Sequence, residues 1–412
     1  MQLDDVILGG GAAGLWLLDA LVRKGRQSLL LEAGRLGSGQ TVASQGIIHG
    51  GLKYTLQGLL TPSATAIREM PALWRRSLAG ETTPDLRGTR LRAECCYLWR
   101  TDTVASRVGM IGARFGLRVA PQTLSRHDRP AVLADCPGTV ARLDEQVISA
   151  VDFIETLARR HRQRILKIDA DNGLEFDIHP GGEVRSIHLT NPNSGQPLKL
   201  MPRQVICTAG AGNASLRRQM GLPVDVMQRR PLHMLMLRGP LPELNGHCVD
   251  GARTRVTITS DRNAAGRRIW QVGGQLAEQG VRLDESLLIE LGCRELTEVI
   301  PGLDLSDVEF ATYRVDRAER IVSGGRRPES VQILRDANVF TAWPTKLALV
   351  PRLVREISAM LLPPSGTAAP NATDDSPVPA NWPRPLVALP PWETAERWSR
   401  PSTNPPAERR AA

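Results

Sequence analysis

Two glycine-rich stretches near the N-terminus hold the residues that could do chemistry. The first, Gly9-Gly10-Gly11-Ala12-Ala13-Gly14, has the spacing G-x-G-x-x-G. In such a motif the first glycine forms a tight turn, the second lets backbone approach a pyrophosphate, and the third lets a helix pack closely on a strand. Glu32 follows eighteen residues after Gly14. A carboxylate there accepts hydrogen bonds from a ribose diol and repels a 2′-phosphate, so the pattern predicts a dinucleotide site.

The second stretch, SQGIIHGGLKY, runs from residue 44 to residue 54. Glycines lack a Cβ, and their clustering around His49 predicts that something flat and bulky lies against this backbone. His49 either orients that group, accepts a proton from a substrate, or simply packs beside it. Lys53 and Tyr54 end the stretch and could face a substrate cavity, although core packing explains Tyr54 equally well.

The elements around the first motif are those that a dinucleotide site needs. Residues 4–9 read as a short buried strand, residues 15–25 as a helix that stops at Gly25, and residues 28–34 as a second buried strand. This β-α-β order places the glycines at the N-terminus of the helix. Free N–H groups and the helix dipole favour negative charge there.

Composition limits the class of protein. The chain has 412 residues, 42% hydrophobic and 23% charged, which is an ordinary composition with room for two or three domains. It has no apolar run of about 18 residues and no signal-peptide pattern, so we expect no membrane span and a cytoplasmic location. The net charge is +9, but the arginines are spread out and aromatic residues make up only 4%. Nucleic acid is therefore not an expected partner, whereas attraction of an anionic substrate is.

Further along the chain, strands and helices alternate. The segment 204–216, QVICTAGAGNASL, reads as a buried strand, a turn of small residues and the start of a helix. By the logic of the first motif, its Ala209 and Gly210 lie beside the same ligand. The remaining elements are three strands within 165–190, a β-rich block at 224–275, a helix at about 284–299, and two strands and a helix within 331–361.

These motifs together resemble the D-amino-acid-oxidase-type (DAO) superfamily of FAD-dependent oxidoreductases. Within it, SQGIIHGGLKY is most similar to the flavin-contacting segment of FAD-linked glycerol-3-phosphate dehydrogenases, and it also resembles 2-hydroxyglutarate dehydrogenases. The resemblance implies FAD as the cofactor. It also implies an α/β fold, with a Rossmann-like FAD-binding domain interwoven with an α+β substrate domain built on a large antiparallel sheet.

The resemblance also implies a division of the chain. The FAD-binding domain is expected from residues 1–60, 140–220 and 335–362, and the substrate domain from 61–139 and 221–334.

The rest, residues 363–412, is rich in proline, which is typical of extended or disordered chain. It is expected to dock in part through the tryptophan-bearing stretch 382–398.

By this resemblance the FAD contacts come from four groups of residues. They are Gly9, Gly11, Ala12, Ala13 and Gly14; Glu32 and Ala33; Ser44, Gln45, Gly46, His49, Gly50 and Gly51; and Ala209, Gly210, Thr345 and Lys346.

One segment departs from the family pattern. Relatives usually have a glycine-rich loop before the final helix, but here Trp343, Pro344, Thr345 and Lys346 stand in that place. The helix N-terminus can still oppose negative charge on reduced flavin, and Lys346 could add a full positive charge at that edge. A second glycine-rich nicotinamide motif is missing, so the electron donor is expected to be the substrate itself.

Arginines late in the chain are candidates for holding an anionic substrate. In this superfamily an arginine near this place often holds a carboxylate or phosphate through two hydrogen bonds. Arg317 is the first choice and Arg314 the second. For Arg320 a surface ion pair with Asp316 or Glu319 is the better interpretation.

His233 is a further candidate, on a strand of the expected substrate domain. It either lines the pocket or is a core histidine.

The sequence thus predicts an FAD-dependent dehydrogenase or oxidase. We expect a catalytic group made of His49, Arg317, Arg314, Lys346 and His233. The substrate is expected to be a small anionic molecule that loses a hydride from a C–OH or C–N bond to the flavin, with an unknown electron acceptor. Two alternatives stay open: a flavoprotein acting on a modified tRNA base or secondary amine, and a non-catalytic FAD-binding protein.

Overall fold

We describe the protein from a computed structural model, in which residues 1–50, 67–101, 122–250, 253–325, 327–366 and 378–400 are described. The chain divides into two compact units. Unit 1 comprises Met1–Glu94, Glu145–Arg230 and Asp316–Pro390, and unit 2 comprises Cys95–Asp144, Pro231–Val315 and Pro391–Ala412.

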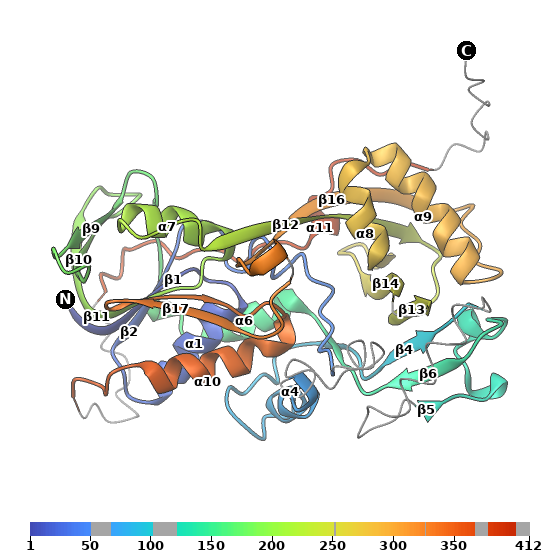
Figure 1. The fold of residues 1–412 in the computed structure, drawn as a ribbon, viewed down its shortest axis with the longest axis horizontal. Helices are drawn as coiled ribbons and strands as arrows, with labels where there is room; N and C mark the ends of the chain where they lie inside the picture. The colour runs from blue at the N-terminus through green and yellow to red at the C-terminus, as the bar shows by residue number, and fades with distance from the viewer. Residues whose placement is uncertain (51–66, 102–121, 251–252, 326, 367–377, 401–412) are drawn as a thin grey trace, which may run out of the picture. The chain divides into compact units, whose positions relative to one another are not determined.

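Unit 1 is built on a mostly parallel sheet (Figure 1). Its strands lie in the order β17-β18-β11-β1-β2-β8, and only β17 runs antiparallel to its neighbour. Strands β9 and β10 form a hairpin, and β10 pairs antiparallel with the amino-terminal part of β11. The strands are β1 (Gln2–Leu8), β2 (Ser28–Glu32), β8 (Ile165–Lys167), β9 (Leu174–Ile178), β10 (Val184–Thr190), β11 (Pro197–Cys207), β17 (Gln332–Asp336) and β18 (Val339–Trp343). This is the Rossmann-like arrangement that the sequence predicted.

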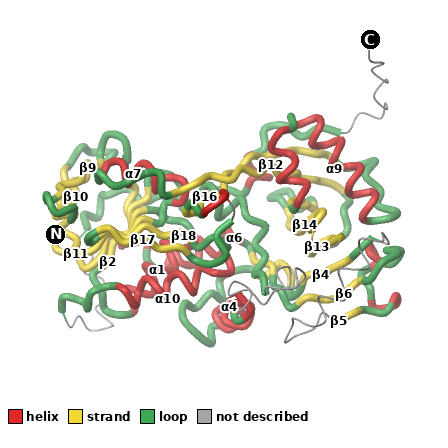
Figure 2. The backbone as a smooth tube through the Cα atoms, in the orientation of Figure 1, coloured by secondary structure: helices red, strands yellow, loops and turns green. Residues whose placement is uncertain are grey.

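Both faces of this sheet are covered, which explains its continuous apolar strands. Along β1, Ile7 belongs to one core cluster while Val6 and Leu8 belong to another, because successive side chains point to opposite faces. The helices on the Ile7 side (red in Figure 2) pack through aromatic rings, including Trp16 and Trp74 at 4.7 Å between centroids. The helices in the described part of unit 1 are α1 (Ala12–Arg23), α4 (Met70–Leu78), α6 (Ala150–Arg160), α7 (Asn213–Gln219) and α10 (Val350–Met360).

Pro71 marks the start of a helix. Residues 67 and 68 are helical, residue 69 is a turn, and α4 begins at Met70. In the structure Pro71 lies in the first turn of α4, where its missing N–H costs no hydrogen bond. Residues 61–66 lie outside the described part of the chain.

The remaining elements that the structure describes in unit 1 are short. They are β3 (Leu91–Ala93) and β7 (Val147–Ile148), which pair with each other, and the 3-10 turns η3 (Arg162–Arg164), η4 (Gly210–Gly212), η6 (Ser323–Gly325) and η7 (Leu347–Leu349).

Unit 2 is built on a mainly antiparallel sheet with the strand order β16-β12-β15-β14-β13-β4-β6-β5. Its described elements are β4 (Cys96–Trp99), β5 (Gln122–Thr123), η1 (Arg126–Asp128), η2 (Ala131–Leu133), β6 (Val140–Leu143), β12 (Met227–Gly239), β13 (Gly246–Asp250), β14 (Arg253–Arg262), β15 (Arg268–Gly273), α8 (Gln275–Gln279), η5 (Gly280–Arg282), α9 (Glu285–Val299), β16 (Glu309–Arg320) and α11 (Pro391–Thr394). The chain leaves one unit for the other within β12 and within β16. A large antiparallel sheet was expected, and it is present.

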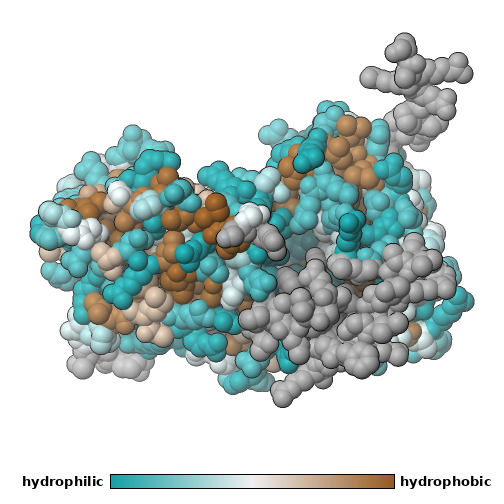
Figure 3. All heavy atoms as spheres, in the orientation of Figure 1, coloured by the Kyte–Doolittle hydropathy of each residue, from teal (hydrophilic) through white to brown (hydrophobic). Residues whose placement is uncertain are grey.

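The surface of the described chain carries both polar and apolar residues. On the face in Figure 3, polar residues (teal) make up much of the described surface, with apolar residues (brown) in groups between them. Leu386 and Leu389 are the most exposed large apolar side chains, at 67% and 54%. Among the helices that the structure describes, none combines the length and apolar character needed to cross a bilayer.

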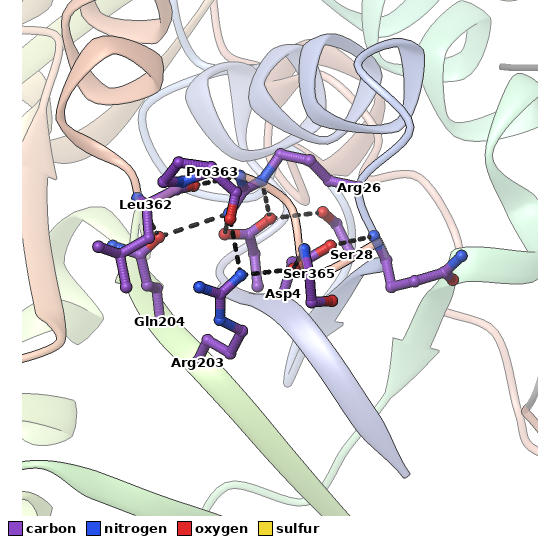
Figure 4. A network of polar contacts seen from close by, with 10 residues as sticks. Asp4, Arg26, Ser28, Arg203, Gln204, Leu362, Pro363 and Ser365 are labelled. Atoms are coloured by element: carbon purple, nitrogen blue, oxygen red, sulfur yellow. Dashed lines mark hydrogen bonds and ion pairs between the residues drawn. The ribbon is translucent and has the colours of Figure 1, made fainter. Parts of the chain in front are cut away.

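A polar network joins the chain beyond α10 to residues within β1 and β11 (Figure 4). Asp5, on β1, accepts two hydrogen bonds from Arg26, at 2.6 and 2.7 Å. A third nitrogen of Arg26 donates to the carbonyl oxygen of Leu362 at 2.6 Å. Arg203 donates to Asp4 at 3.3 Å. The last residues of β1 and β11, Leu8 and Cys207, are not part of this network.

Asp19 joins α1 to α6 inside unit 1. Its carboxylate, 1% exposed, accepts from His161 at 2.8 Å, Arg160 at 2.9 Å and Arg23 at 2.8 Å. Burial alone would raise the pKa of Asp19, but the hydrogen bonds from His161 and Arg160 outweigh it and lower the pKa from 3.8 to about 2. The ionised carboxylate therefore stabilises the folded state.

We predict that Asp19→Asn lowers the free energy of unfolding at pH 7 by about 2 kcal/mol, the amount that this pKa difference represents. Because the folded-state pKa of Asp19 is lowered, its carboxylate contributes to the free energy of unfolding above about pH 4, and this contribution is lost as the pH falls toward 2. Urea unfolding of both proteins across this range measures it. Asp85→Asn, which removes an exposed pair with Arg87, is the control and should have little effect. A constant difference at all pH values would contradict the assignment.

Candidate cofactor and active site

The turn between β1 and α1 can be made only from glycine at two positions. Gly9 has φ +111°, a left-handed conformation that side chains rarely adopt. A Cβ added to Gly14 would lie 2.0 Å from the carbonyl oxygen of Gly9. The Thr208 hydroxyl, at the end of β11, donates to that same oxygen at 2.9 Å. The turn therefore brings α1 against the carboxyl end of β1 as closely as backbone allows.

Glu32, at the end of β2, faces this turn. Its Oε2 accepts from the backbone N–H of Gly10 at 2.6 Å, and its Oε1 accepts from that of Gly34 at 2.6 Å. Lys167, on the neighbouring strand β8, donates to the carbonyl oxygens of Ala33 and Gly34. The carboxylate is thus fixed at the sheet edge, and each of its oxygens keeps acceptor capacity for a ribose diol.

The N-terminus of α1 is suited to an anion. Gly11, its N-cap, supplies no side-chain hydrogen bond, and the first turn carries no acidic residue. One first-turn N–H, that of Ala12, donates to the Thr41 hydroxyl at 3.2 Å. Sequence reasoning missed Thr41, because its contact with α1 depends on how the following loop folds back.

A second small-residue turn lies at the end of β11. The backbone N–H of Ala209 donates to the side chain of Asn213, the first residue of α7, at 2.8 Å. The Gln40 side chain lies 3.5 Å from the position of a Cβ on Gly210 and accepts from the N–H of Ala318 at 2.9 Å. Gln40, which the sequence did not indicate, thereby joins this turn to β16.

The segment 44–50 lies against the chain around β7. Gly46 has φ +73°, and a Cβ there would lie 2.1 Å from the carbonyl oxygen of Ile148, so only glycine fits. The N–H of Ile148 in turn donates to the Gly46 carbonyl at 3.0 Å. The buried hydroxyl oxygen of Ser44 has no hydrogen-bond partner among the described residues. Gly51, Lys53 and Tyr54 lie outside the described residues, so the expectations for them stay untested.

His49 is paired with a buried carboxylate. Its Nδ1 lies 3.3 Å from Glu145 Oε2, and the side chains are 31% and 6% exposed. Glu145 Oε1 accepts from the N–H of Gly50 at 2.7 Å. A histidine whose Nδ1 is protonated toward a carboxylate presents the lone pair of Nε2 as its proton acceptor. The sequence did not indicate Glu145 as part of the site.

The segment before α10 holds strained and polar groups. Thr345 has φ +61°, uncommon for a residue with a β-branched side chain, and such strain persists where the surroundings enforce it. The buried Thr345 hydroxyl and Trp343 indole N–H have no partners within the described part of the chain. Arg327 donates to the Thr345 carbonyl oxygen at 2.7 Å. Lys346 is 7% exposed.

These residues fit FAD. The N-terminus of α1, whose first turn carries no acidic residue, suits a diphosphate. The fixed carboxylate of Glu32 suits a ribose, and backbone where a Cβ does not fit suits a flat ring. The partnerless hydroxyls of Ser44 and Thr345 are buried polar groups, and such groups are normally satisfied by a ligand or water if not by protein.

The other predicted residues have local partners. His233 is 3% exposed, its Nδ1 lies 3.1 Å from the Gly280 carbonyl oxygen, and burial lowers its pKa, as for a core histidine. Arg314 donates to the carbonyl oxygens of Val281 and Leu283 at 3.0 and 2.8 Å. Arg317 is partly buried on β16. Their roles toward a substrate stay predictions.

The ion pair expected for Arg320 is wrong. Among the described residues Glu319 pairs with Arg230 at 2.8 Å, and Asp316 lies 3.7 Å from Arg229. Both arginines come from β12, the strand beside β16. Glu319 and Arg320 are adjacent on the strand and point to opposite faces, and Asp316 is four residues, about 13 Å, from Arg320, whereas cross-strand neighbours lie close together on one face.

Comparison with known proteins agrees with this geometry. Residues 4–333 match the family model DAO, described as FAD dependent oxidoreductase. The chain is 37% identical over 404 residues to the probable FAD-dependent oxidoreductase PA4991 of Pseudomonas aeruginosa, covering 96% of this chain and 98% of that one. The crystal structure of that protein matches with a TM-score of 0.79 at 35% identity, over 96% and 98% of the two chains.

More distant structures share the fold alone. Glycine oxidase from Geobacillus kaustophilus matches with a TM-score of 0.63 at 15% identity, over 89% of this chain and 96% of that one. Dithionite-reduced L-α-glycerophosphate oxidase from Mycoplasma pneumoniae, with FAD bound, matches with a TM-score of 0.60 at 14% identity, over 88% and 95%. The family predicted from the sequence is confirmed: the chain belongs to the DAO family and is an FAD-dependent oxidoreductase.

Proposed function

We propose that this enzyme oxidises a C–OH or C–N bond of a small anionic substrate, with His49 as the group that takes the substrate's O–H or N–H proton. The observation that carries the proposal is the pair of His49 with buried Glu145, 3.3 Å apart, on the segment that resembles the flavin-contacting part of the family. FAD, when bound, supplies the hydride acceptor. The protein's part is to orient the substrate and remove the proton.

Glu145 gives His49 the geometry of a base. Because Glu145 accepts from Gly50 N–H at 2.7 Å, its carboxylate is fixed relative to the backbone of the same segment that carries His49. The carboxylate orients the ring and stabilises the imidazolium that forms when Nε2 takes a proton. Glu145 is thus proposed as a positioning residue.

The anionic end of the substrate is assigned to an arginine. Arg317 lies on β16 directly before Ala318, whose N–H is bound by Gln40 beside the Gly210 turn. Its planar guanidinium can bind a carboxylate or phosphate through two hydrogen bonds. Arg314 stays the second choice, since its terminal nitrogens already donate to two carbonyl oxygens.

The substrate class follows from resemblance. SQGIIHGGLKY is similar to segments of glycerol-3-phosphate and 2-hydroxyglutarate dehydrogenases, which favours a polyol phosphate or 2-hydroxy acid. Two proteins of the same fold are named for glycine and for L-α-glycerophosphate, which are both small and carry an anionic group, a carboxylate in one and a phosphate in the other. Because one fold hosts many chemistries, these names support the class and no single compound.

The FAD contacts are proposed at the residues that the sequence indicated. They are Gly9, Gly11, Ala12, Ala13, Gly14, Glu32, Ala33, Ser44, Gln45, Gly46, His49, Gly50, Gly51, Ala209, Gly210, Thr345 and Lys346. The positive charge of Lys346 would oppose the negative charge of reduced flavin.

The direct test is anaerobic reduction of the purified, FAD-loaded enzyme by hydroxy acids, polyol phosphates and amino acids. We expect the flavin absorbance to bleach with one of these anionic classes. Bleaching only by uncharged secondary amines, or by tRNA, would replace the proposal with the alternative substrate class. An FAD-loaded enzyme that no compound reduces would contradict the proposed substrates.

Gly11→Ala tests where FAD lies. A Cβ on Gly11 would meet only the Thr41 hydroxyl, at 3.3 Å, so we predict an apoprotein that unfolds at nearly the wild-type temperature. The added methyl group blocks the approach of a diphosphate, and we expect FAD affinity to fall by at least about tenfold. Titration of the apoprotein with FAD measures it. Unchanged affinity would contradict a diphosphate at this turn.

His49→Gln is predicted to slow flavin reduction by about a hundredfold, because a general base contributes 10²–10⁴-fold. Glu145→Gln should slow it less and move the pH profile of reduction, since the amide cannot stabilise the imidazolium. Stopped-flow reduction with the substrate found above measures both. Glu155→Gln, at an exposed position on α6, is the matched control. Equal rates in the control and the two site variants would contradict the role of the pair.

A further inference from the structure

A segment near the C-terminus, residues 378–390, contacts unit 1 at β8 and at the loop that follows β2. The first contact is with β8. The indole N–H of Trp382 donates to the Lys167 carbonyl oxygen at 2.8 Å, and the backbone N–H of Lys167 donates to the Pro383 carbonyl oxygen at 2.9 Å. Trp382 is 2% exposed and belongs to the core beneath the sheet. The segment is therefore part of the folded unit.

The same segment then reaches the loop that follows β2. The N–H of Leu36 donates to the Leu386 carbonyl oxygen at 2.8 Å, and the N–H of Ala388 donates to the Leu36 carbonyl at 2.9 Å. These two bonds flank Val387 in a parallel β-bridge with Leu36. The side chains of Leu386 and Leu389 are exposed, whereas that of Val387 packs against the core cluster that contains Leu36. The attachment is therefore made by the main chain together with the Val387 side chain.

Leu36 in turn touches the dinucleotide turn. It is 1% exposed, and its Cδ2 lies 2.3 Å from the position of a Cβ on Gly10. The next residue, Gly37, donates its N–H to the Gly10 carbonyl oxygen at 2.9 Å. Gly10 is also the residue whose N–H is bound by Glu32. A contiguous set of contacts thus runs from Ala388 through Leu36 to the backbone proposed to face the diphosphate.

We infer that residues 386–388 are a remote part of the FAD-binding site, which they serve by holding Leu36 over Gly10. A loop held in its bound conformation before the cofactor arrives loses less conformational freedom on binding, so affinity rises. The inference concerns cofactor binding and does not depend on which substrate the enzyme oxidises. FAD uptake can be measured without substrate, which keeps the two tests separate.

Ala388→Pro tests this inference, because proline removes the N–H that Leu36 accepts. Val387 is already in a β-bridge, the extended conformation that a residue before proline prefers. Two variants serve as controls. Ala388→Gly keeps the N–H, and Leu389→Pro places proline where the backbone N–H has no acceptor within the described residues.

The measurements are the dissociation constant of FAD for each apoprotein and the unfolding temperature of each apoprotein. We expect Ala388→Pro to bind FAD about tenfold more weakly, the effect of one lost hydrogen bond, at a nearly unchanged apoprotein unfolding temperature. Both controls should bind FAD within about twofold of the wild type. Hydrogen exchange of residues 33–37 should be faster in Ala388→Pro alone.

Equal FAD affinity in Ala388→Pro and Leu389→Pro would overturn the inference. If Ala388→Pro fails to fold, Leu36→Ala replaces it, since this variant keeps both backbone bonds and removes only the side chain over Gly10. Its FAD affinity should then fall by a similar factor, and unchanged affinity would overturn the inference equally.

Discussion

The structure of unit 1 depends on one close backbone contact. A Cβ on Gly14 would lie 2.0 Å from the carbonyl oxygen of Gly9, so α1 can begin directly at the end of β1 only because glycine stands at both places. That approach places the helix N-terminus at the carboxyl edge of the sheet. Glu32, Thr41 and Thr208 then bond to the turn and fix it. The rest of the proposed site surrounds this point.

The site is assembled from segments far apart in sequence because they share this edge. The carboxyl ends of β1, β2, β11 and β18 carry the glycine turn, Glu32, the Ala209-Gly210 turn and the 343–346 segment in that order along the chain. Ligands of open parallel sheets bind at this edge. The Asp5–Arg26 network involves residues before the carboxyl ends of β1 and β11 and stabilises the unit.

Local motifs allowed the sequence to predict the family, the cofactor and the alternation of strands and helices. The turn glycines and Glu32 are separated by short, regular elements, so their spacing alone carries the information. The partners of these residues were not predictable in the same way. Glu145 meets His49 only because residues 46–48 pair with residues 146–148, and that pairing is set by tertiary structure. The Arg320 prediction failed for a related reason: it paired sequence neighbours, whereas the strand pairs Asp316 and Glu319 with β12.

We propose a site in two parts, a fixed frame for FAD and the histidine–carboxylate pair beside it. A crystal structure of the FAD-loaded enzyme tests this most directly. The account predicts the diphosphate at the N-terminus of α1, the hydroxyls of Ser44 and Thr345 bonded to the cofactor, and His49 beside the isoalloxazine ring with Glu145 still at its Nδ1. A ring that lies away from residues 44–50, or a diphosphate bound elsewhere than at Gly9–Gly14, would contradict it.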